Sequence, residues 1–251
     1  MVEHTRFHGI HAATVCPMRS DYTIDEDALA RHVASVAAVP GIPGLLVNGH
    51  AGENFLLTRE EMKRVVTCVR ASVPANCNLT VGVNAESSTE AARIAADAEA
   101  AGADALLVFP PNSWALNHDR EMVLAHHRHV LEASRLPLVL YHAPVGAGRM
   151  AYSPETVAAL VEEERVQAIK EGSWEVATYE QMWRLVKARR PDIAVLGSGD
   201  EHILTSLLIG SDGAQVSLAA VVPELTVKLY RAAKDGDWGE ARRLHDLMYP
   251  L

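Results

Sequence analysis

Val166-Gln167-Ala168-Ile169-Lys170 is a short apolar run that ends in a lysine, and Leu138-Val139-Leu140-Tyr141, earlier in the chain, ends in a tyrosine. Runs of this length and composition predict buried strands. A lysine at the inner end of such a strand loses hydration, which lowers its pKa toward the range in which a free amine attacks a carbonyl. The alternative is a side chain that leaves the strand end and reaches solvent along its aliphatic stem. Lys170 is therefore a candidate Schiff-base nucleophile.

The same pattern repeats along the chain, with short apolar runs ending in Gly, Asn or Pro and alternating with Ala-, Glu- and Arg-rich segments of helical periodicity. The predicted strands are Ile10–Val15, Gly44–Asn48, Leu79–Val83, Ala105–Phe109, Leu138–Tyr141, Val166–Lys170, Ile193–Leu196 and Gly213–Ser217. Helix starts are also recognisable. Thr58-Arg59-Glu60-Glu61 is a capping-box pattern, and Ser153-Pro154 places an N-cap before a proline at the first helical position.

These units predict an α/β fold of the (β/α)8 TIM-barrel type. The runs are apolar on both faces, as a parallel sheet covered by helices requires. Eight strands in 251 residues fit a closed barrel better than an open doubly wound sheet, and no Gly-x-Gly-x-x-Gly follows the first strand. We expect the barrel to occupy residues 1–222, with residues 223–251 forming a C-terminal helical segment packed on it.

Composition narrows the class of protein. The net charge of -9 and the lack of a Lys/Arg run argue against a nucleic-acid partner. The N-terminus has no apolar leader region, and no later run is long enough to cross a bilayer, so a soluble cytoplasmic protein without a membrane partner is expected. Cys16, Cys68 and Cys77 lack metal-type spacing and are expected to be reduced thiols.

In such a barrel the chemistry lies at the carboxyl ends of the strands. Polar groups follow several predicted strands: Asn48–Glu53, Gly82–Asn84, Tyr141–Pro144, Lys170–Gly172 and Gly197–Glu201. Each alone is explained by a turn or a helix cap. Together they predict one polar mouth around Lys170 and Tyr141.

At these residues the sequence resembles the dihydrodipicolinate synthase and N-acetylneuraminate lyase superfamily of class I pyruvate-type aldolases. The resemblance runs through Gly49–Glu53, Val81–Asn84, Tyr141–Pro144, Ile169–Glu171 and Gly213–Ser217. It implies that Lys170 forms an imine with a 2-keto acid and that Tyr141 relays protons. It implies no cofactor and no metal, and a homodimer or homotetramer. Family members continue for several helices beyond the barrel, so a shortened C-terminal helical extension is expected here.

The resemblance also implies that the turn Gly49–Glu53 holds the substrate carboxylate, through Gly49, Ala51, Gly52 and Glu53. The family usually has two hydroxyl residues where this chain has His50 and Ala51. Backbone amides can still bind the anion. Imidazole titrates near neutrality, so His50 is predicted to replace the first hydroxyl as a general acid-base, the alternative being a histidine that only caps the turn.

Two further departures bear on the substrate. True dihydrodipicolinate synthases carry an arginine where this chain has Gly146, and Arg149 is displaced in register. Losing that bidentate carboxylate clamp disfavours 4-hydroxy-tetrahydrodipicolinate synthase, which stays as an alternative. Asp200, Glu201 and Ser217 match positions that hold substrate hydroxyls in sialic-acid lyases, although such acidic pairs also cap helices. A 2-keto-3-deoxy sugar acid, cleaved or dehydrated, is the favoured substrate.

Other interpretations remain open. A metal-dependent aldolase would recruit His50, Glu53, His142, Asp200 and Glu201. The cluster His126-His127-His129 is expected to line a solvated or subunit-contact face rather than a metal site. Trp114 and Leu116 would face a partner subunit, or Trp114 would shield the pocket. A non-catalytic keto-acid-binding barrel is the remaining alternative.

Overall fold

The barrel predicted from the sequence is confirmed. The computed structural model describes residues 5–251, and its eight strands are all parallel and close in chain order, with β8 paired to β1. The strands are β1 (Gly9–Ala13), β2 (Gly44–Val47), β3 (Asn78–Val83), β4 (Ala105–Val108), β5 (Leu138–His142), β6 (Val166–Glu171), β7 (Ala194–Gly197) and β8 (Gly213–Val216). The predicted strand ends differ from these by one or two residues.

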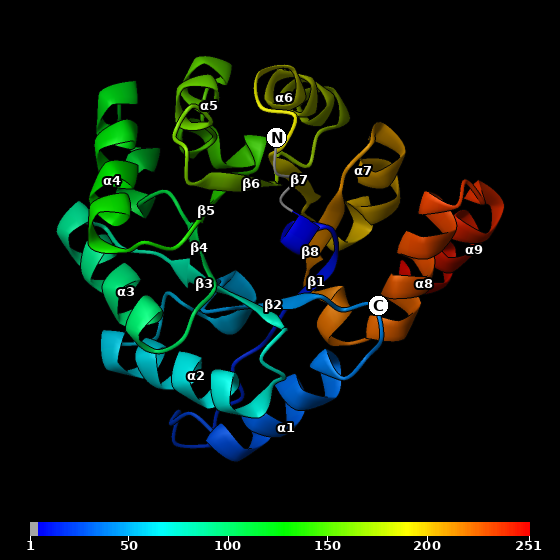
Figure 1. Ribbon diagram of the computed structural model, residues 1–251, viewed down its shortest axis with the longest axis horizontal. Coiled ribbons are helices and arrows are strands. Elements are labelled where there is room, and N and C mark those ends of the chain that lie inside the picture. Colours follow the sequence, from blue (N-terminus) through cyan, green and yellow to red (C-terminus); the bar gives the residue numbers. More distant parts are fainter. Residues whose placement is uncertain (1–4) are drawn as a thin grey trace.

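Helices surround the barrel on its outer side (Figure 1). They are α1 (Glu26–Ala37), α2 (Arg59–Ser72), α3 (Ser88–Ala100), α4 (Arg120–Ala133), α5 (Pro154–Leu160), α6 (Val176–Arg189), α7 (Ile203–Ile209), α8 (Pro223–Lys234) and α9 (Trp238–Met248). Helix α8 follows the last strand and α9 packs against it, so a helix is present beyond the barrel. The division at residue 222 stays a prediction.

The predicted helix starts are also confirmed. The Thr58 side chain accepts a hydrogen bond from the amide of Glu61, whose carboxylate accepts one from the Thr58 amide, which completes the capping box of α2. Ser153 caps α5 in the same way through the amide of Thr156, with Pro154 at the first helical position. These caps satisfy amides that the first helical turn leaves without partners.

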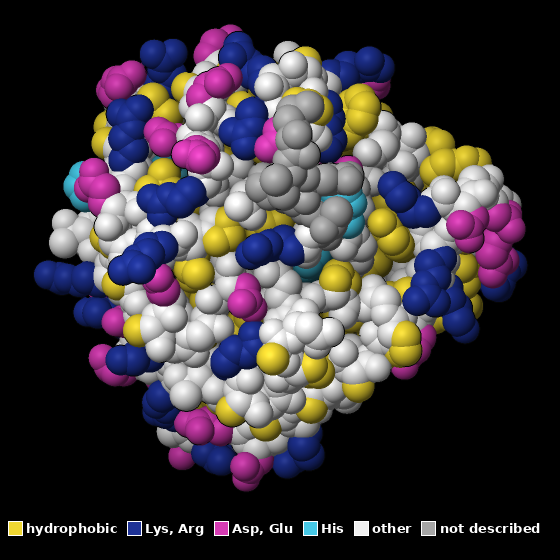
Figure 2. Space-filling view, in the orientation of Figure 1, with side chains coloured by type: hydrophobic (Ala, Val, Ile, Leu, Met, Phe, Trp, Pro, Cys, Tyr) yellow, Lys and Arg dark blue, Asp and Glu magenta, His cyan; other side chains and the backbone are white. Residues whose placement is uncertain are grey.

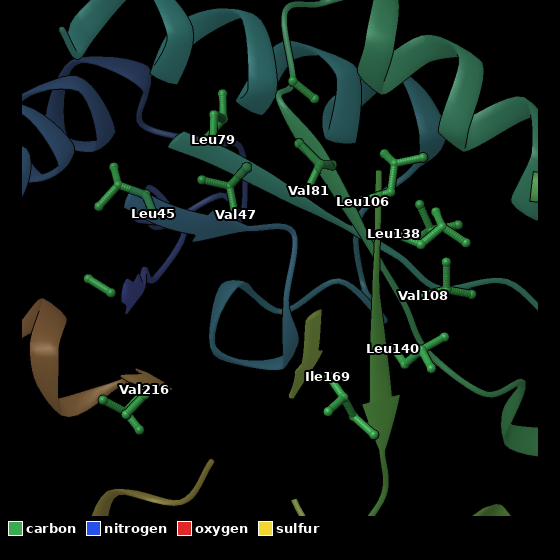
Figure 3. Packing of buried hydrophobic residues seen from close by; sticks show 14 of the residues in the cluster. Leu45, Val47, Leu79, Val81, Leu106, Val108, Leu138, Leu140, Ile169 and Val216 are labelled. Carbon is green, nitrogen blue, oxygen red and sulfur yellow. The ribbon is translucent and has the colours of Figure 1, made fainter. Parts of the chain in front are cut away.

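Apolar side chains fill two layers, one on each side of the barrel wall. Outward residues such as Leu45, Val81 and Leu140 pack under the helices, and Figure 3 shows them around the strands. Inward residues form a separate cluster that includes Leu107 and Leu196. Phe7, in the short 3-10 helix η1 (Thr5–Phe7) that precedes β1, is fully buried in this inner cluster. Burying one such side chain contributes about 1.5–3 kcal/mol.

The visible surface is chemically mixed. Figure 2 shows Lys and Arg side chains interspersed with Asp and Glu on one face of the molecule. Within residues 5–251 no helix is both long and apolar enough to cross a membrane. Cys16, Cys68 and Cys77 are free thiols.

A buried hydrogen bond joins β5 to β6 behind the barrel wall. His142 Nδ1 lies 2.8 Å from Glu171 Oε1, and His142 Nε2 donates to the carbonyl of Tyr152 at 3.1 Å. The other Glu171 oxygen accepts from the amide and hydroxyl of Ser173. Each ring nitrogen of His142 is therefore within hydrogen-bond distance of an oxygen, one on Glu171 and one on Tyr152. Both side chains are almost fully buried.

We predict that Glu171→Ala lowers the free energy of unfolding by about 3–5 kcal/mol, because it leaves the buried His142 ring and the amide and hydroxyl of Ser173 without their hydrogen-bond partner. The matched control is Asp246→Ala, which breaks an exposed ion pair with Arg242 and should cost less than about 1 kcal/mol. Urea denaturation followed by circular dichroism measures both. Equal, small effects from the two substitutions would contradict a stabilising role for these buried hydrogen bonds.

Candidate active site

A cavity of about 280 Å³ opens among the carboxyl ends of the strands. Its lining comes from β1, β2, β5, β6 and β8 and from the segments after β2, β6, β7 and β8. The lining residues are Ala13, Leu46, His50, Ala51, Tyr141, Lys170, Trp174, Ser198, Gly199, Asp200, Glu201, Gln215, Val216 and Ser217. Of the stretches predicted to form the polar mouth, those at the ends of β2, β5, β6 and β7 contribute residues to this cavity, whereas Gly82–Asn84 at the end of β3 does not.

Lys170 and Tyr141 are direct partners in the register of β5 and β6. The Lys170 ammonium lies 5.9 Å from the centroid of the Tyr141 ring. Burial lowers the pKa of Lys170 to about 8, although the nearby Asp200 carboxylate acts in the opposite direction. Burial raises the pKa of Tyr141 to about 12, and the charge of Glu171 adds to this shift. The cavity therefore holds an amine of reduced basicity beside a phenol that stays protonated.

The turn after β2 brings His50 over the cavity. Asn48 adopts a left-handed conformation with φ 51°, and its side-chain amide donates to the carbonyl of Met62 in α2 at 3.0 Å. Gly82 on β3 is needed here, because a Cβ at that position would lie 2.0 Å from the carbonyl oxygen of Asn48. The turn is then closed by a hydrogen bond from the Gly52 amide to the Gly49 carbonyl.

The His50 imidazole is part of an aromatic stack at the mouth. Its ring centroid lies 4.2 Å from that of Phe109 and 4.8 Å from that of Phe55, in stacked geometry. The Tyr141 ring meets it edge-on at 5.6 Å. Burial among these rings, and then the positive charge of Lys170, lower the pKa of His50 to about 4. This lowered pKa favours the neutral ring at pH 7, although part of the side chain remains exposed.

The structure separates the predicted residues of this turn. His50 and Ala51 line the cavity, whereas Gly49, Gly52 and Glu53 are not among its lining residues. Gly49 packs against the Leu46 side chain, and Glu53 is exposed in a left-handed conformation. The amides of Gly52 and Glu53 donate to carbonyls within the turn. Any anion held by this turn would meet the amides of His50 and Ala51.

On the opposite side, the segments after β7 and β8 bring Asp200, Glu201 and Ser217 to the cavity. One oxygen of Asp200 accepts from the amide of Leu218 at 2.7 Å. Burial raises the pKa of Asp200. Asp200 therefore ties the β7 end to the β8 end and lines the cavity as well, but its side chain does not cap the helix that follows it in sequence.

Two lining residues, Trp174 and Gln215, had no role predicted from the sequence, and Ser198 was included only as part of the stretch Gly197–Glu201. Trp174 lies in the loop after β6, and a Cβ on Gly199 would approach its indole nitrogen to 2.8 Å, so glycine is needed there. A large aromatic residue shortly after the strand-ending Lys170 was the signal available for Trp174. The only signal for Gln215 was the alternation of side chains along the last strand, which places it on the inner face.

The structure corrects the interpretation of the histidine cluster and that of Trp114. His126 and His127 do not line a solvated or subunit-contact face, because both are fully buried; only His129 is exposed. The rings of His126, His127 and Trp114 pack together, and Trp114 is buried away from the cavity lining. Leu116 alone of the predicted contact pair is exposed.

The side chains required by a metal-dependent aldolase do not converge. His142 is buried behind the wall in its pair with Glu171, and Glu53 is not among the residues that line the cavity. In the part of the chain from residue 5 to 251, no group of three or more His, Cys, Asp or Glu side chains is arranged to hold a metal ion.

Comparisons with known proteins identify the family of the chain. The Dihydrodipicolinate synthetase family matches residues 6–251. A 4-hydroxy-tetrahydrodipicolinate synthase of Methanothrix thermoacetophila is 34% identical over 98% of this chain and 80% of its own length. A probable 2-dehydro-3-deoxy-D-pentonate aldolase of Escherichia coli is 32% identical over 98% of this chain and 81% of its own.

A solved structure is similarly close. A prophage protein of Escherichia coli from the dihydrodipicolinic acid synthase family, in complex with pyruvate, superimposes with a TM-score of 0.87 at 26% identity. The superposition covers 97% of this chain and 80% of that one. With its barrel, its strand-end lysine and these matches, the chain belongs to the dihydrodipicolinate synthetase family, whose members are lyases and aldolases.

Proposed function

We propose that the protein is a Schiff-base lyase that acts on a 2-keto acid, and that this acid is a 2-keto-3-deoxy sugar acid. The observation that carries the proposal is the amine of Lys170, which lies in the cavity beside Tyr141 with its pKa lowered to about 8 by burial. At pH 7 about a tenth of such an amine is neutral, against fewer than about one in a thousand for an ordinary lysine. The cavity thus supplies the nucleophile that imine formation requires.

In the proposed mechanism the Lys170 amine adds to the keto carbon and water leaves. In cleavage, the protonated imine accepts the electron pair of the bond between the alpha and beta carbons while the hydroxyl on the beta carbon loses its proton, so an aldehyde leaves and an enamine remains. In dehydration, the alpha carbon loses a proton to give the enamine, and the hydroxyl on the beta carbon is then protonated and leaves as water. The phenol of Tyr141 is protonated and lies beside the amine, which suits it to donate a proton to the departing oxygen and take it back. Protonation of the enamine and hydrolysis of the imine then release product and the lysine.

The proposed carboxylate site is the turn that carries His50 and Ala51. Their amides have no hydrogen-bond partner in the described part of the chain, and both residues line the cavity. Successive backbone amides of this kind bind anions without side-chain help. Gly49, Gly52 and Glu53 would then shape the turn rather than contact the substrate.

The polar rim supports a hydroxylated substrate. Asp200, Glu201 and Ser217 face the same cavity, and carboxylates accept hydrogen bonds from hydroxyl groups. A second carboxylate on the substrate would find no guanidinium among the lining residues. Arg149 donates to the side chain of Asn117 at 2.7 Å instead, and Gly146 has open space where a side chain would begin. These features favour a sugar acid over an aldehyde that bears a carboxylate.

A second candidate is 4-hydroxy-tetrahydrodipicolinate synthase, because the Methanothrix thermoacetophila relative carries that name. It shares the imine step with the leading proposal and differs in the partner of pyruvate. We further propose a homodimer or homotetramer, supported by the exposed apolar side chain of Leu116 in the segment after β4.

We predict that borohydride traps pyruvate on the wild-type protein and on the control Lys228→Ala, whose lysine is exposed on α8, but leaves Lys170→Ala unmodified. Intact-protein mass spectrometry measures the adduct. A pyruvate adduct of equal yield in folded Lys170→Ala would refute the assignment of the nucleophile.

The pH dependence of trapping gives a second prediction. The free amine is the nucleophile, so the rate should rise with pH and level off above the Lys170 pKa of about 8. Asp200→Asn removes a charge that raises this pKa and should shift the curve to lower pH. Stopped-flow mixing with pyruvate, followed by quenching in borohydride across pH 6 to 10, provides the measurement. A curve that does not move would show that Asp200 has no influence on the amine.

The proposed acid-base role of His50 is tested by two replacements. His50→Phe retains the aromatic stack with Phe109 and Phe55 but cannot transfer a proton, whereas His50→Ala removes both functions. If His50 transfers protons, each variant should lower turnover by about 10²- to 10⁴-fold while pyruvate trapping persists. Retention of turnover by the phenylalanine variant would instead assign His50 a packing role.

A further inference from the structure

Gln215 carries a carboxamide into the floor of the cavity without a partner. The side chain lies on β8, is fully buried and lines the cavity. Neither its oxygen nor its nitrogen has a hydrogen-bond partner within residues 5–251. Buried polar atoms in folded proteins are almost always paired, so two unpaired atoms on one side chain that faces a cavity call for an explanation.

The neighbouring side chains do not supply that partner. Gln215 pairs in register with His11 on β1, whose ring is also buried with both nitrogens unpaired. The His11 ring lies over Gly44 on β2, because a Cβ at Gly44 would come within 2.7 Å of its Nδ1. Ala13, the next inward residue of β1, is apolar, and neither Ser198 nor Ser217 forms a hydrogen bond with Gln215. The partner must therefore come from the cavity.

The chemistry of the carboxamide limits what this partner is. Its nitrogen donates and its oxygen accepts, so a group that both accepts and donates satisfies it completely. A hydroxyl group does both. A carboxylate only accepts and would leave the oxygen of Gln215 unpaired, and a methyl group would leave both atoms unpaired. The lysine-bound end of pyruvate offers no hydroxyl, whereas a sugar acid offers several.

We propose that Gln215 is a specificity-determining residue that hydrogen-bonds a hydroxyl of the 2-keto acid held at Lys170. This inference rests on the proposed function, because it presumes an imine at Lys170. It concerns a residue within strand β8, whereas Asp200 and Glu201 belong to the segment after the neighbouring strand β7. It adds recognition from the barrel floor, where solvent competes least for the hydrogen bond.

The test compares two ligands of equal carbon number, 2-keto-3-deoxygluconate, which has hydroxyl groups, and 2-oxohexanoate, which has none. Borohydride trapping and intact-protein mass spectrometry give the concentration of each ligand for half-maximal labelling, with adducts of every mass summed. Gln215→Leu removes the carboxamide at similar volume. We expect it to reduce the preference for the hydroxylated acid by about 10- to 100-fold, through weaker labelling by that acid alone.

The matched control is Gln167→Leu on β6, because Gln167 also has a buried, unpaired oxygen but does not line the cavity. It should keep the wild-type preference. Gln215→Met, which is unbranched like glutamine, provides a second apolar variant if Gln215→Leu does not fold. Pyruvate trapping by each protein serves as the internal reference for the imine.

The outcomes are distinct. An unchanged preference in a folded Gln215 variant that still traps pyruvate would overturn the inference and assign a buried water to the carboxamide. An equal loss in Gln167→Leu would overturn it as well, because the effect would then be structural. Failure of the wild-type protein to trap either pyruvate or the sugar acid would defeat the proposed function itself.

Discussion

Strand alternation in a closed barrel is the constraint on which the site depends. Each strand has one set of side chains inside and one set outside, and a parallel barrel buries both. On β6, Lys170 therefore faces the cavity while Glu171, one residue later, faces the helices and pairs with His142. The proposed nucleophile, Lys170, and the buried partner of His142, Glu171, are thus consecutive residues. A slip of one residue in this strand would exchange them and abolish both arrangements.

The site balances desolvation against charge. The apolar wall lowers the Lys170 pKa, and the Asp200 carboxylate limits how far it falls. Asp200 in turn is held by a backbone amide at the end of β8. His50 is affected by both factors, because its stacked ring is desolvated and stands near the Lys170 charge. Burial therefore shifts the pKa of all three titratable groups, and the charges of Lys170 and Asp200 act on each other.

The sequence predicted the barrel and the pairing of Lys170 with Tyr141, because short apolar runs mark the strands and these two residues end two of the runs. The sequence did not predict which side chains are buried or face the cavity where contacts between distant segments decide this. Nothing local distinguishes His126, which is buried between helices, from the exposed His129 three residues later. Trp174 belongs to a loop whose path depends on Gly199 across the mouth. Gln215 has a polar side chain of a type usually found on protein surfaces, yet it lies inside the barrel. Its position in the cavity can be recognised only once the register of β8 is known.

The buried ring of Phe7 limits the routes by which substrate, product and water can reach the cavity. Phe7 belongs to the inner cluster and lies next to His11, one layer below the cavity-lining Ala13. The interior of the barrel is therefore packed with side chains at its amino-terminal end, and the cavity lies at its carboxyl-terminal end. In the proposed reaction, one opening at the carboxyl ends of the strands would therefore serve three molecules. These are the keto acid, the water released when the imine forms, and the water that later hydrolyses the imine. Entry of the hydrolytic water and departure of the product would then compete for one passage beside His50 and Trp174.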